Sequence, residues 1–366
     1  MDRYLGDILR FQPHTKTEAA TWFREASDHW ENLAADSPLE SRFFQQLAQT
    51  SNNLGILLAP QDPTAAAQTY EKSLIALETL ADLDPENSSK PADRSSLAKT
   101  HHNLGLLLTA IRPEQAQEPL LHALDEFRAL QEDFPENPLY RVNVVTVVNA
   151  LGTLAFTTGR KQDAKQFFQE TRELRTALAE KYPRQHFLQN SLAWFLATCP
   201  DTEFRNPPLA VKFAQQAIRL KKQMGHYYNT LGVALYRAGR WDSARKALDA
   251  AVKLNKGGDG SDWIFLAMTH WKLNNHEQAH DWYHKAVNWI SDNKPYDLEL
   301  QRFRIEAAQL LGIPVTAPLP QLGKTRRQHV PENLFPRRRN TYVSITPQYR
   351  RLRLSAPLTS FDEPVG

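Results

Sequence analysis

The stretch NTLGVALYRAGRWDSARKALDAAVKL, residues 229–254, holds two apolar patterns with a turn between them. In the first pattern, Gly232 stands among leucines that are spaced four residues apart, as on one face of a helix. In the second, small and apolar residues follow one another at offsets of four and three, again on one helix face: Ala244, Leu248 and Ala251. Gly239, between the patterns, suits the left-handed conformation that commonly ends a helix. The stretch therefore predicts two helices joined by a tight turn.

Both patterns recur along the chain. The first recurs around a small residue in the same column, at Gly6, Gly55, Gly105, Gly152, Ala193, Gly232 and Ala267. In most copies an alanine follows, then a large residue four positions later and a small residue three positions after that. The distance between copies falls from 50 residues, between Gly55 and Gly105, to 35 residues, between Gly232 and Ala267. Such self-similarity predicts a stack of helix pairs, each of which buries its apolar face only against its neighbours.

We therefore expect an all-α, right-handed α-solenoid of about seven helix pairs over residues 1–313. Repeats over 1–185 have the long period, those over 186–313 have the shorter one, and a last apolar helix at 295–313 is expected to cap the stack. A glycine inside a helix costs roughly 0.5–1 kcal/mol relative to alanine. We expect the recurring glycine to lie where the backbone of the second helix approaches the first, so that a bulky residue there would splay the pair.

The columns of small, alanine and aromatic residues resemble the tetratricopeptide repeat, whose pattern the copy at 229–254 follows. Two further segments, LAWFLATCPD at 192–201 and GGDGSDWIFLAMTHWKLNNHEQAHDWYHKAV at 257–287, resemble the C-terminal repeat regions of planctomycete-type serine/threonine protein kinases. The resemblance implies a non-catalytic scaffold that binds a protein or peptide in the concave groove of a superhelix. It leaves open that the chain is the regulatory, substrate-binding half of such a kinase, or that its partner is a protein kinase.

Composition and motifs narrow the class of protein. No Gly-rich loop with a strand lysine, no His-Arg-Asp and no Asp-Phe-Gly sequence occurs, so we expect no kinase or other enzyme activity, no catalytic residues and no cofactor. A single cysteine excludes an intramolecular disulfide and favours a reducing, cytoplasmic location. The longest uncharged run, residues 142–159, carries several Asn, Thr and Gly residues and is too polar for a membrane span.

The resemblance also implies which columns of the first helices face the groove. Positions three before and one, four and five after the small residue select eight candidate binding residues: Asn149, Asn190, Trp194, Asn229, Tyr236, Arg237, Trp271 and Lys272. An asparagine amide both donates and accepts hydrogen bonds, so a ladder of asparagines could bind the backbone of an extended peptide. The alternative is that these asparagines tie helices to one another and that Trp271 is half-buried.

Two further groups of residues have a possible chemistry. His276, His280 and His284 recur every four residues along one predicted helix, a spacing that could chelate zinc. The interpretation we favour is a solvated helix face with no metal, because other residues occupy the packing positions of that helix. Cys199 has no basic residue within four positions to lower its thiol pKa, so we expect an inert cysteine at the end of a repeat helix.

The C-terminal segment, residues 314–366, differs in composition from the repeats. It has nine Lys and Arg residues against three Asp and Glu residues, and it mixes proline and arginine without a helical period. This composition predicts a basic, disordered arm. Its arginine clusters could bind nucleic acid or an anionic surface, and a solvated arm without a ligand is the alternative.

Overall fold

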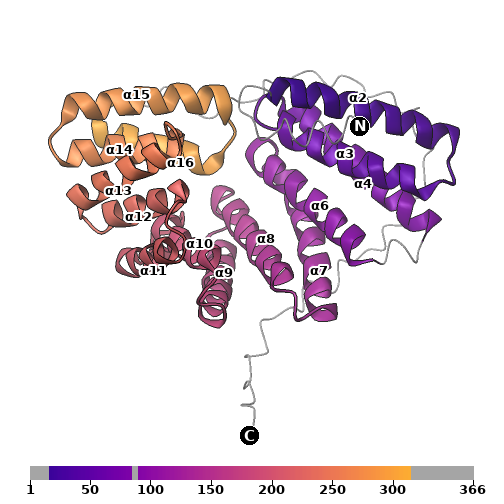
Figure 1. Ribbon diagram of the computed structural model, residues 1–366, viewed down its shortest axis with the longest axis horizontal. Helices are drawn as coiled ribbons and strands as arrows, with labels where there is room; N and C mark the ends of the chain where they lie inside the picture. Colours follow the sequence, from indigo (N-terminus) through magenta and orange to yellow (C-terminus); the bar gives the residue numbers. More distant parts are fainter. Residues whose placement is uncertain (1–15, 85–89, 315–366) are drawn as a thin grey trace, which may run out of the picture. The chain divides into compact units, whose positions relative to one another are not determined.

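The computed structural model describes residues 16–84 and 90–314, which lie within one compact unit (Figure 1). The described residues contain no strand, two short 3-10 helices, η2 (Pro113–Gln115) and η3 (Thr202–Phe204), and fourteen α-helices. These α-helices are α2 (Lys16–Asp36), α3 (Ser41–Leu58), α4 (Pro63–Leu83), α6 (Pro91–Ile111), α7 (Gln117–Asp133), α8 (Pro138–Thr157), α9 (Lys161–Lys181), α10 (His186–Thr198), α11 (Pro207–Leu220), α12 (Gly225–Arg237), α13 (Trp241–Leu254), α14 (Gly260–Lys272), α15 (His276–Asn293) and α16 (Leu298–Leu311).

The helices pair in the order that the two sequence patterns predict. Each first helix packs on the helix that follows it, in the pairs α3/α4, α6/α7, α8/α9, α10/α11, α12/α13 and α14/α15. α2 carries the second pattern of the first copy and packs on α3. The all-α solenoid prediction is confirmed. The predicted first helix around Gly6 and the basic arm from residue 315 onward lie outside the described residues.

The recurring glycine makes room for one large side chain of the second helix. A Cβ atom added to Gly232 would lie 2.5 Å from Leu248 Cγ, and one added to Gly152 would lie 2.7 Å from the Phe168 ring. Gly55 meets Tyr70 and Gly105 meets Leu120 in the same way. At Gly105 and Gly232 the backbone N of the same large residue would also lie 3.3 Å from the added Cβ atom, so the backbone of the second helix approaches these glycines as expected. The side chain of the large residue lies closer still.

The turns inside the pairs follow the sequence signals. Gly159 and Gly239 have φ angles of 75° and 73° just after α8 and α12. Asn274, after α14, has a φ angle of 61° and is one of two non-glycine residues with positive φ in the described part of the chain. Glycine and asparagine adopt this left-handed conformation at the least cost, which explains their place at these helix ends.

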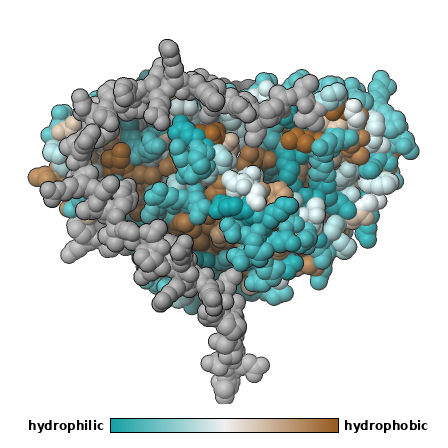
Figure 2. Space-filling view, turned by 180° about the vertical axis from the view of Figure 1, so that it is seen from behind, coloured by the Kyte–Doolittle hydropathy of each residue, from teal (hydrophilic) through white to brown (hydrophobic). Residues whose placement is uncertain are grey.

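The core runs through the stack between the helix pairs. Among the described helices, α8 is long enough and apolar enough by composition to cross a membrane, but half of its apolar stretch is buried inside the protein. It packs on α7 and α9, as a core helix of a repeat does. Figure 2 shows that the surface is largely hydrophilic and that hydrophobic side chains gather in hollows near the middle of the displayed face.

α16 packs on α14 and α15 and so extends the stack at its C-terminal end, as the predicted capping helix would. Its buried residues include Leu300, Phe303, Ala307 and Leu311. The helix begins at Asp297, whose side chain accepts hydrogen bonds from the backbone N–H groups of Glu299 and Leu300. α16 also reaches back to α10 and α12, and this contact defines the candidate site.

Candidate protein-binding groove

The first helices of the pairs, α3, α6, α8, α10, α12 and α14, form one side of the stack, here called the groove face. α16 covers this face at α10 and α14. The indole Nε1–H of Trp194, in α10, donates to both carboxylate oxygens of Glu299 at 3.2 Å. The ring of Phe303 meets Trp194 edge-on, with centroids 6.1 Å apart, and lies 4.9 Å from the ring of Phe265 in α14. The last helix in the described part of the chain therefore contacts the groove column that Trp194 occupies.

Arg237, in α12, is a second predicted groove residue that contacts α16. Its Nη2 donates to Oε2 of Glu306 at 2.7 Å and its Nη1 donates to Oε1, with 11% of the Arg237 side chain exposed. Burial by itself raises the pKa of Glu306, but the hydrogen bonds from Arg237 and the charges of Arg205 and Arg302 outweigh it and lower that pKa overall. Tyr236, beside Arg237, is buried in the core. The ion pair therefore fixes α16 to the groove face in the charged form.

Asn229 ties two repeats together. Its side chain is buried, and its Nδ2 donates to Oδ1 of Asp262, in α14, at 2.7 Å. Asn255 Nδ2 donates to the other oxygen of Asp262 at 3.3 Å. Burial, with the nearby charge of Asp259, raises the pKa of Asp262 to about 6. The amide of Asn229 thus links two helices, as the alternative to the peptide-binding ladder predicts.

Trp271 and Lys272 lie near the end of α14 where the chain turns into α15. Trp271 is half-buried, as its alternative interpretation predicts, and its ring packs edge-on against His276 at 4.3 Å and His280 at 5.8 Å between centroids. Lys272 is exposed, with its Nζ 5.9 Å from the ring of Trp241. Trp271 therefore contacts the second helix of its own pair, and Lys272 lies near the first residue of α13 in the preceding pair.

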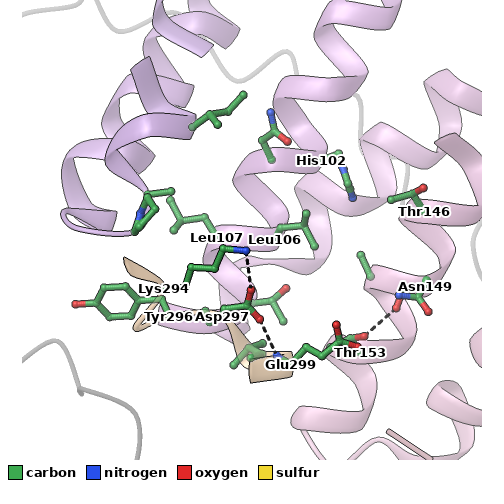
Figure 3. A pocket seen from close by; sticks show the side chains of 18 of the residues that line it. His102, Leu106, Leu107, Thr146, Asn149, Thr153, Lys294, Tyr296, Asp297 and Glu299 are labelled. Carbon is green, nitrogen blue, oxygen red and sulfur yellow. Dashed lines mark hydrogen bonds and ion pairs between the residues drawn. The ribbon is translucent and has the colours of Figure 1, made fainter. Parts of the chain in front are cut away.

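The groove face stays open beside α6 and α8. A cavity of about 490 Å³, here called the α6–α8 cavity, is lined by α3, α4, α6, α8 and the segment 294–299 that leads into α16. Figure 3 shows the labelled side chains of α6 and α8 around this cavity, together with Lys294, Tyr296 and Glu299. Burial lowers the pKa of His102 in this cavity to about 4, so its imidazole is neutral at pH 7. The walls are mainly apolar.

A second cavity, of about 590 Å³, lies between α8, α9, α10 and α16 and is here called the α8–α10 cavity. The two cavities share four lining residues: Asn149, Thr153, Leu298 and Glu299. They therefore adjoin at the first turn of α16. Of the predicted residues, Asn149 lines both cavities and Trp194 lines the second one. Asn190 lines neither cavity, and its Oδ1 is buried and accepts no hydrogen bond from the described residues.

The most exposed apolar side chains of these cavities are residues that the sequence selection missed. Leu106 is 45% exposed and Ile56 is 42% exposed, both in the α6–α8 cavity, and Phe156, in the α8–α10 cavity, is 40% exposed. Ile56 and Leu106 stand one position after their glycine, as Trp194 stands one after its alanine. The positions that the resemblance assigns to the groove therefore include Ile56 and Leu106. They were not selected because only amide, aromatic and charged side chains in the later repeats were chosen.

The three candidate zinc-binding histidines and Cys199 lie outside the groove columns, in surroundings of their own. Within residues 16–84 and 90–314, no group of three His, Cys, Asp or Glu side chains is placed to hold a metal ion. His276 and His284 are exposed, and the rings of His280 and His284 stack with centroids 6.4 Å apart. Cys199 is buried at the end of α10, and burial raises the pKa of its thiol to about 12. The thiolate that a reactive cysteine needs is therefore disfavoured.

Residues 205–297 match the tetratricopeptide repeat family. This tetratricopeptide segment includes α11 to α15 and contains the contact between Gly232 and Leu248. The same contact between a glycine and a large residue recurs in the pairs α3/α4, α6/α7 and α8/α9, outside the matched segment. The family that matches is a repeat module and not an enzyme family. No curated protein matches the chain.

Several solved structures of helical repeat proteins are similar to the chain in fold, at low sequence identity. Yeast Tom70 is 16% identical with a TM-score of 0.44, and the match covers 81% of this chain and 61% of Tom70. TTC0263, a thermophilic tetratricopeptide repeat protein of Thermus thermophilus, is 18% identical with a TM-score of 0.31, over 73% of this chain and all of that protein. Pseudomonas aeruginosa PilF is 16% identical with a TM-score of 0.36, over 72% and 99% of the two chains.

Proposed function

We propose that the protein is a non-catalytic interaction scaffold that binds an extended segment of a protein partner along the open part of the groove face. The observation that carries the proposal is the pair of adjoining cavities beside α6, α8 and α10. Their exposed apolar residues, Ile56, Leu106 and Phe156, offer anchors for apolar side chains of the partner. Asn149, which lines both cavities, offers an amide that can donate to and accept from a peptide backbone.

α16 divides the groove face into a filled part and an open part. The filled part, at α10, α12 and α14, has its aromatic and charged groups bonded to Glu299, Phe303 and Glu306. Phe303 is fully buried, so removing α16 would expose a large apolar area, at roughly 25 cal/mol per Å². We therefore assign the partner to the open part and treat α16 as a permanent element of the fold.

The experiment compares the full chain with Leu106→Asp and Phe156→Asp in pull-downs from cells that express the chain at its native level. The matched control is Leu139→Asp, because Leu139 is 57% exposed on α8 and lines neither cavity. We expect each cavity variant to lower recovery of a reproducible partner at least about tenfold, as loss of a central anchor does. Unchanged recovery with both variants, in protein with unchanged thermal unfolding, would contradict the proposal.

The finer proposal, that the partner is a serine/threonine protein kinase, is supported by the segments at 192–201 and 257–287 that resemble kinase-associated repeat regions. We expect a kinase to co-purify with the chain and to be lost with Leu106→Asp. Mass spectrometry of the recovered proteins checks this expectation. If a different protein is recovered and is lost with the same variant, the scaffold proposal is retained and the kinase proposal is rejected.

A further inference from the structure

The α8–α10 cavity is lined by two arginines that stand outside the predicted groove columns. Arg175 comes from α9 and Arg302 from α16. Nη1 of Arg175 donates to the carbonyl oxygen of Ser191 at 3.2 Å, and Nη2 of Arg302 donates to the carbonyl oxygen of Thr198 at 2.6 Å. These bonds to neutral carbonyl groups hold both side chains in place. The two arginines have one carboxylate close to them in the cavity wall, that of Glu299, which lies 3.7 Å from Arg302 Nη2.

Each arginine keeps a nitrogen without an acceptor. Nε of Arg175 and Nη1 of Arg302 are buried and have no hydrogen-bond partner among the described residues. Buried polar groups are nearly always hydrogen-bonded, so these two donors show that the protein does not use the full hydrogen-bonding capacity of either guanidinium group. A guanidinium group presents its donors in a planar fork, which matches the oxygens of a carboxylate or a phosphate.

The balance of charge around the cavity is positive. Glu299 is the one carboxylate among the described lining residues, and its Oε1 lies 3.7 Å from Arg302 Nη2. Burial lowers the pKa of Arg175 to about 10 and also lowers that of Arg302, in spite of the opposing charge of Glu299. Beyond the lining, Arg205 and Arg237 add two cations close to Arg302, and Glu306 adds one carboxylate. Arg205 Nε donates to the Cys199 carbonyl oxygen at 2.7 Å. An incoming anion would therefore relieve uncompensated positive charge.

The rest of the wall is apolar. Phe156 and Ile305 expose 40% and 37% of their surface, and the indole of Trp194 lies beside them in the lining. The Arg175 guanidinium carbon lies 5.7 Å from the ring centroid of Phe195, a contact that orients the guanidinium plane. A group that carries negative charge next to an apolar body would contact both kinds of wall at once.

We propose that the α8–α10 cavity is an oxyanion-binding site, formed by Arg175 and Arg302, for a carboxylate or phosphate group that lies next to an apolar side chain of the bound segment. The proposal deepens the proposed function by stating the chemistry of the partner at one position. It does not need a partner for its test, because a small aromatic anion carries the same chemistry.

The test uses the full chain labelled with ¹⁵N and three probes of similar size: 4-phenylbutyrate, phenyl phosphate and the neutral 4-phenylbutanamide. The readout is the indole N–H signal of Trp194, which is assigned among the eight tryptophans with Trp194→Phe. We expect the anions to shift this signal with affinities at least about tenfold above that of the amide, as charge-assisted bonds to arginine favour. The tighter of the two anions identifies a carboxylate or a phosphate as the natural group.

Substitutions of the two arginines test whether the preference for anions depends on their positive charge. Arg302→Gln and Arg175→Gln should each reduce the preference for anions over the amide to below about threefold. Arg175→Lys keeps the charge but loses the planar fork, so it should retain only part of the preference. Arg245→Gln, which breaks an exposed ion pair with Asp249, is the matched control and should leave the preference unchanged. In the unmodified protein, raising NaCl from about 0.05 to 0.5 M should weaken binding of the anions and leave that of the amide unchanged.

Three results would overturn the oxyanion site: equal affinity for the amide and the anions, no shift of the Trp194 signal by any probe, or an anion preference that neither salt nor the Gln variants reduce. None of them bears on partner recovery with Leu106→Asp, which tests the scaffold separately. If a Gln variant fails to fold, the salt series with the unmodified protein still decides between the outcomes.

Discussion

Arg237 of α12 and Glu306 of α16 form a two-bond ion pair across the groove face, although 69 residues separate them in the sequence. Only 11% of the arginine side chain and 32% of the glutamate side chain are exposed. The pair turns a helix at the end of the solenoid into a lid over the concave side of the preceding repeats. It thereby determines which part of the groove face stays uncovered.

Breaking this pair should destabilise the fold. Glu306→Gln removes the counter-ion of Arg237, whose side chain is mostly buried. We therefore expect the free energy of unfolding to fall by about 2 kcal/mol. Denaturant titration followed by circular dichroism measures the change. Asp249→Asn, which removes the exposed partner of Arg245, should change the free energy by less than about 0.5 kcal/mol. Equal small effects of both variants would contradict this assignment.

The contact between Gly232 and Leu248 should show strong coupling. A Cβ atom at residue 232 would lie 2.5 Å from Leu248, so Gly232→Ala should destabilise the protein by about 2 kcal/mol through overpacking. In a Leu248→Ala background, which by itself costs about 2–5 kcal/mol, the side-chain clash is gone and most of the cost of the added methyl group should disappear. The double-mutant cycle measures this difference. Additive effects would show that the side chains do not share the space.

The carboxyl group of Glu299 should make stability fall as pH rises through the neutral range. Burial raises its pKa to about 7 from an ordinary value of 4.5, so the folded state binds its proton more tightly than the unfolded state does. Its contribution is fully present below about pH 4.5 and is lost as pH approaches and passes 7. We expect Glu299→Gln to remove this slope from the unfolding free energy measured between pH 5 and 8. An identical slope in the variant would contradict the shift.

His101 and His102 should make stability fall as pH is lowered, which is the opposite of the effect of Glu299. Burial lowers the pKa of each imidazole from 6.5 to about 4, with the charge of His122 adding to the effect on His101. The folded state therefore binds these protons less tightly than the unfolded state, and stability should fall as pH is lowered from 6.5 toward 4. The double variant His101→Gln, His102→Gln should show a weaker loss in this window by thermal unfolding at each pH. His276→Gln, at an exposed histidine, is the control.

The sequence predicted the repeat and its internal packing because these depend on residues that are close together in the chain. Gly152 and Phe168, or Gly232 and Leu248, are sixteen residues apart, and each pair recurs in register with the turn glycine between them. The period of 3.6 residues leaves the same local pattern in these copies, and a left-handed helix end marks the turns at Gly159, Gly239 and Asn274. The groove columns came from the resemblance to the tetratricopeptide repeat, and two of the residues they select, Asn149 and Trp194, line the α8–α10 cavity.

Tertiary structure alone decided which of these columns remain free. Glu299 and Trp194 are 105 residues apart, and nothing in the pattern of α16 distinguishes a helix that caps a stack from one that also crosses its inner side. Asn149 and Asn229 occupy equivalent columns, but one borders a cavity and the other bonds to Asp262. The physical reason is that local periodicity determines which side chains share a helix face. Whether that face meets solvent, a neighbouring repeat or a distant helix depends on how the curvature of the stack brings remote segments together.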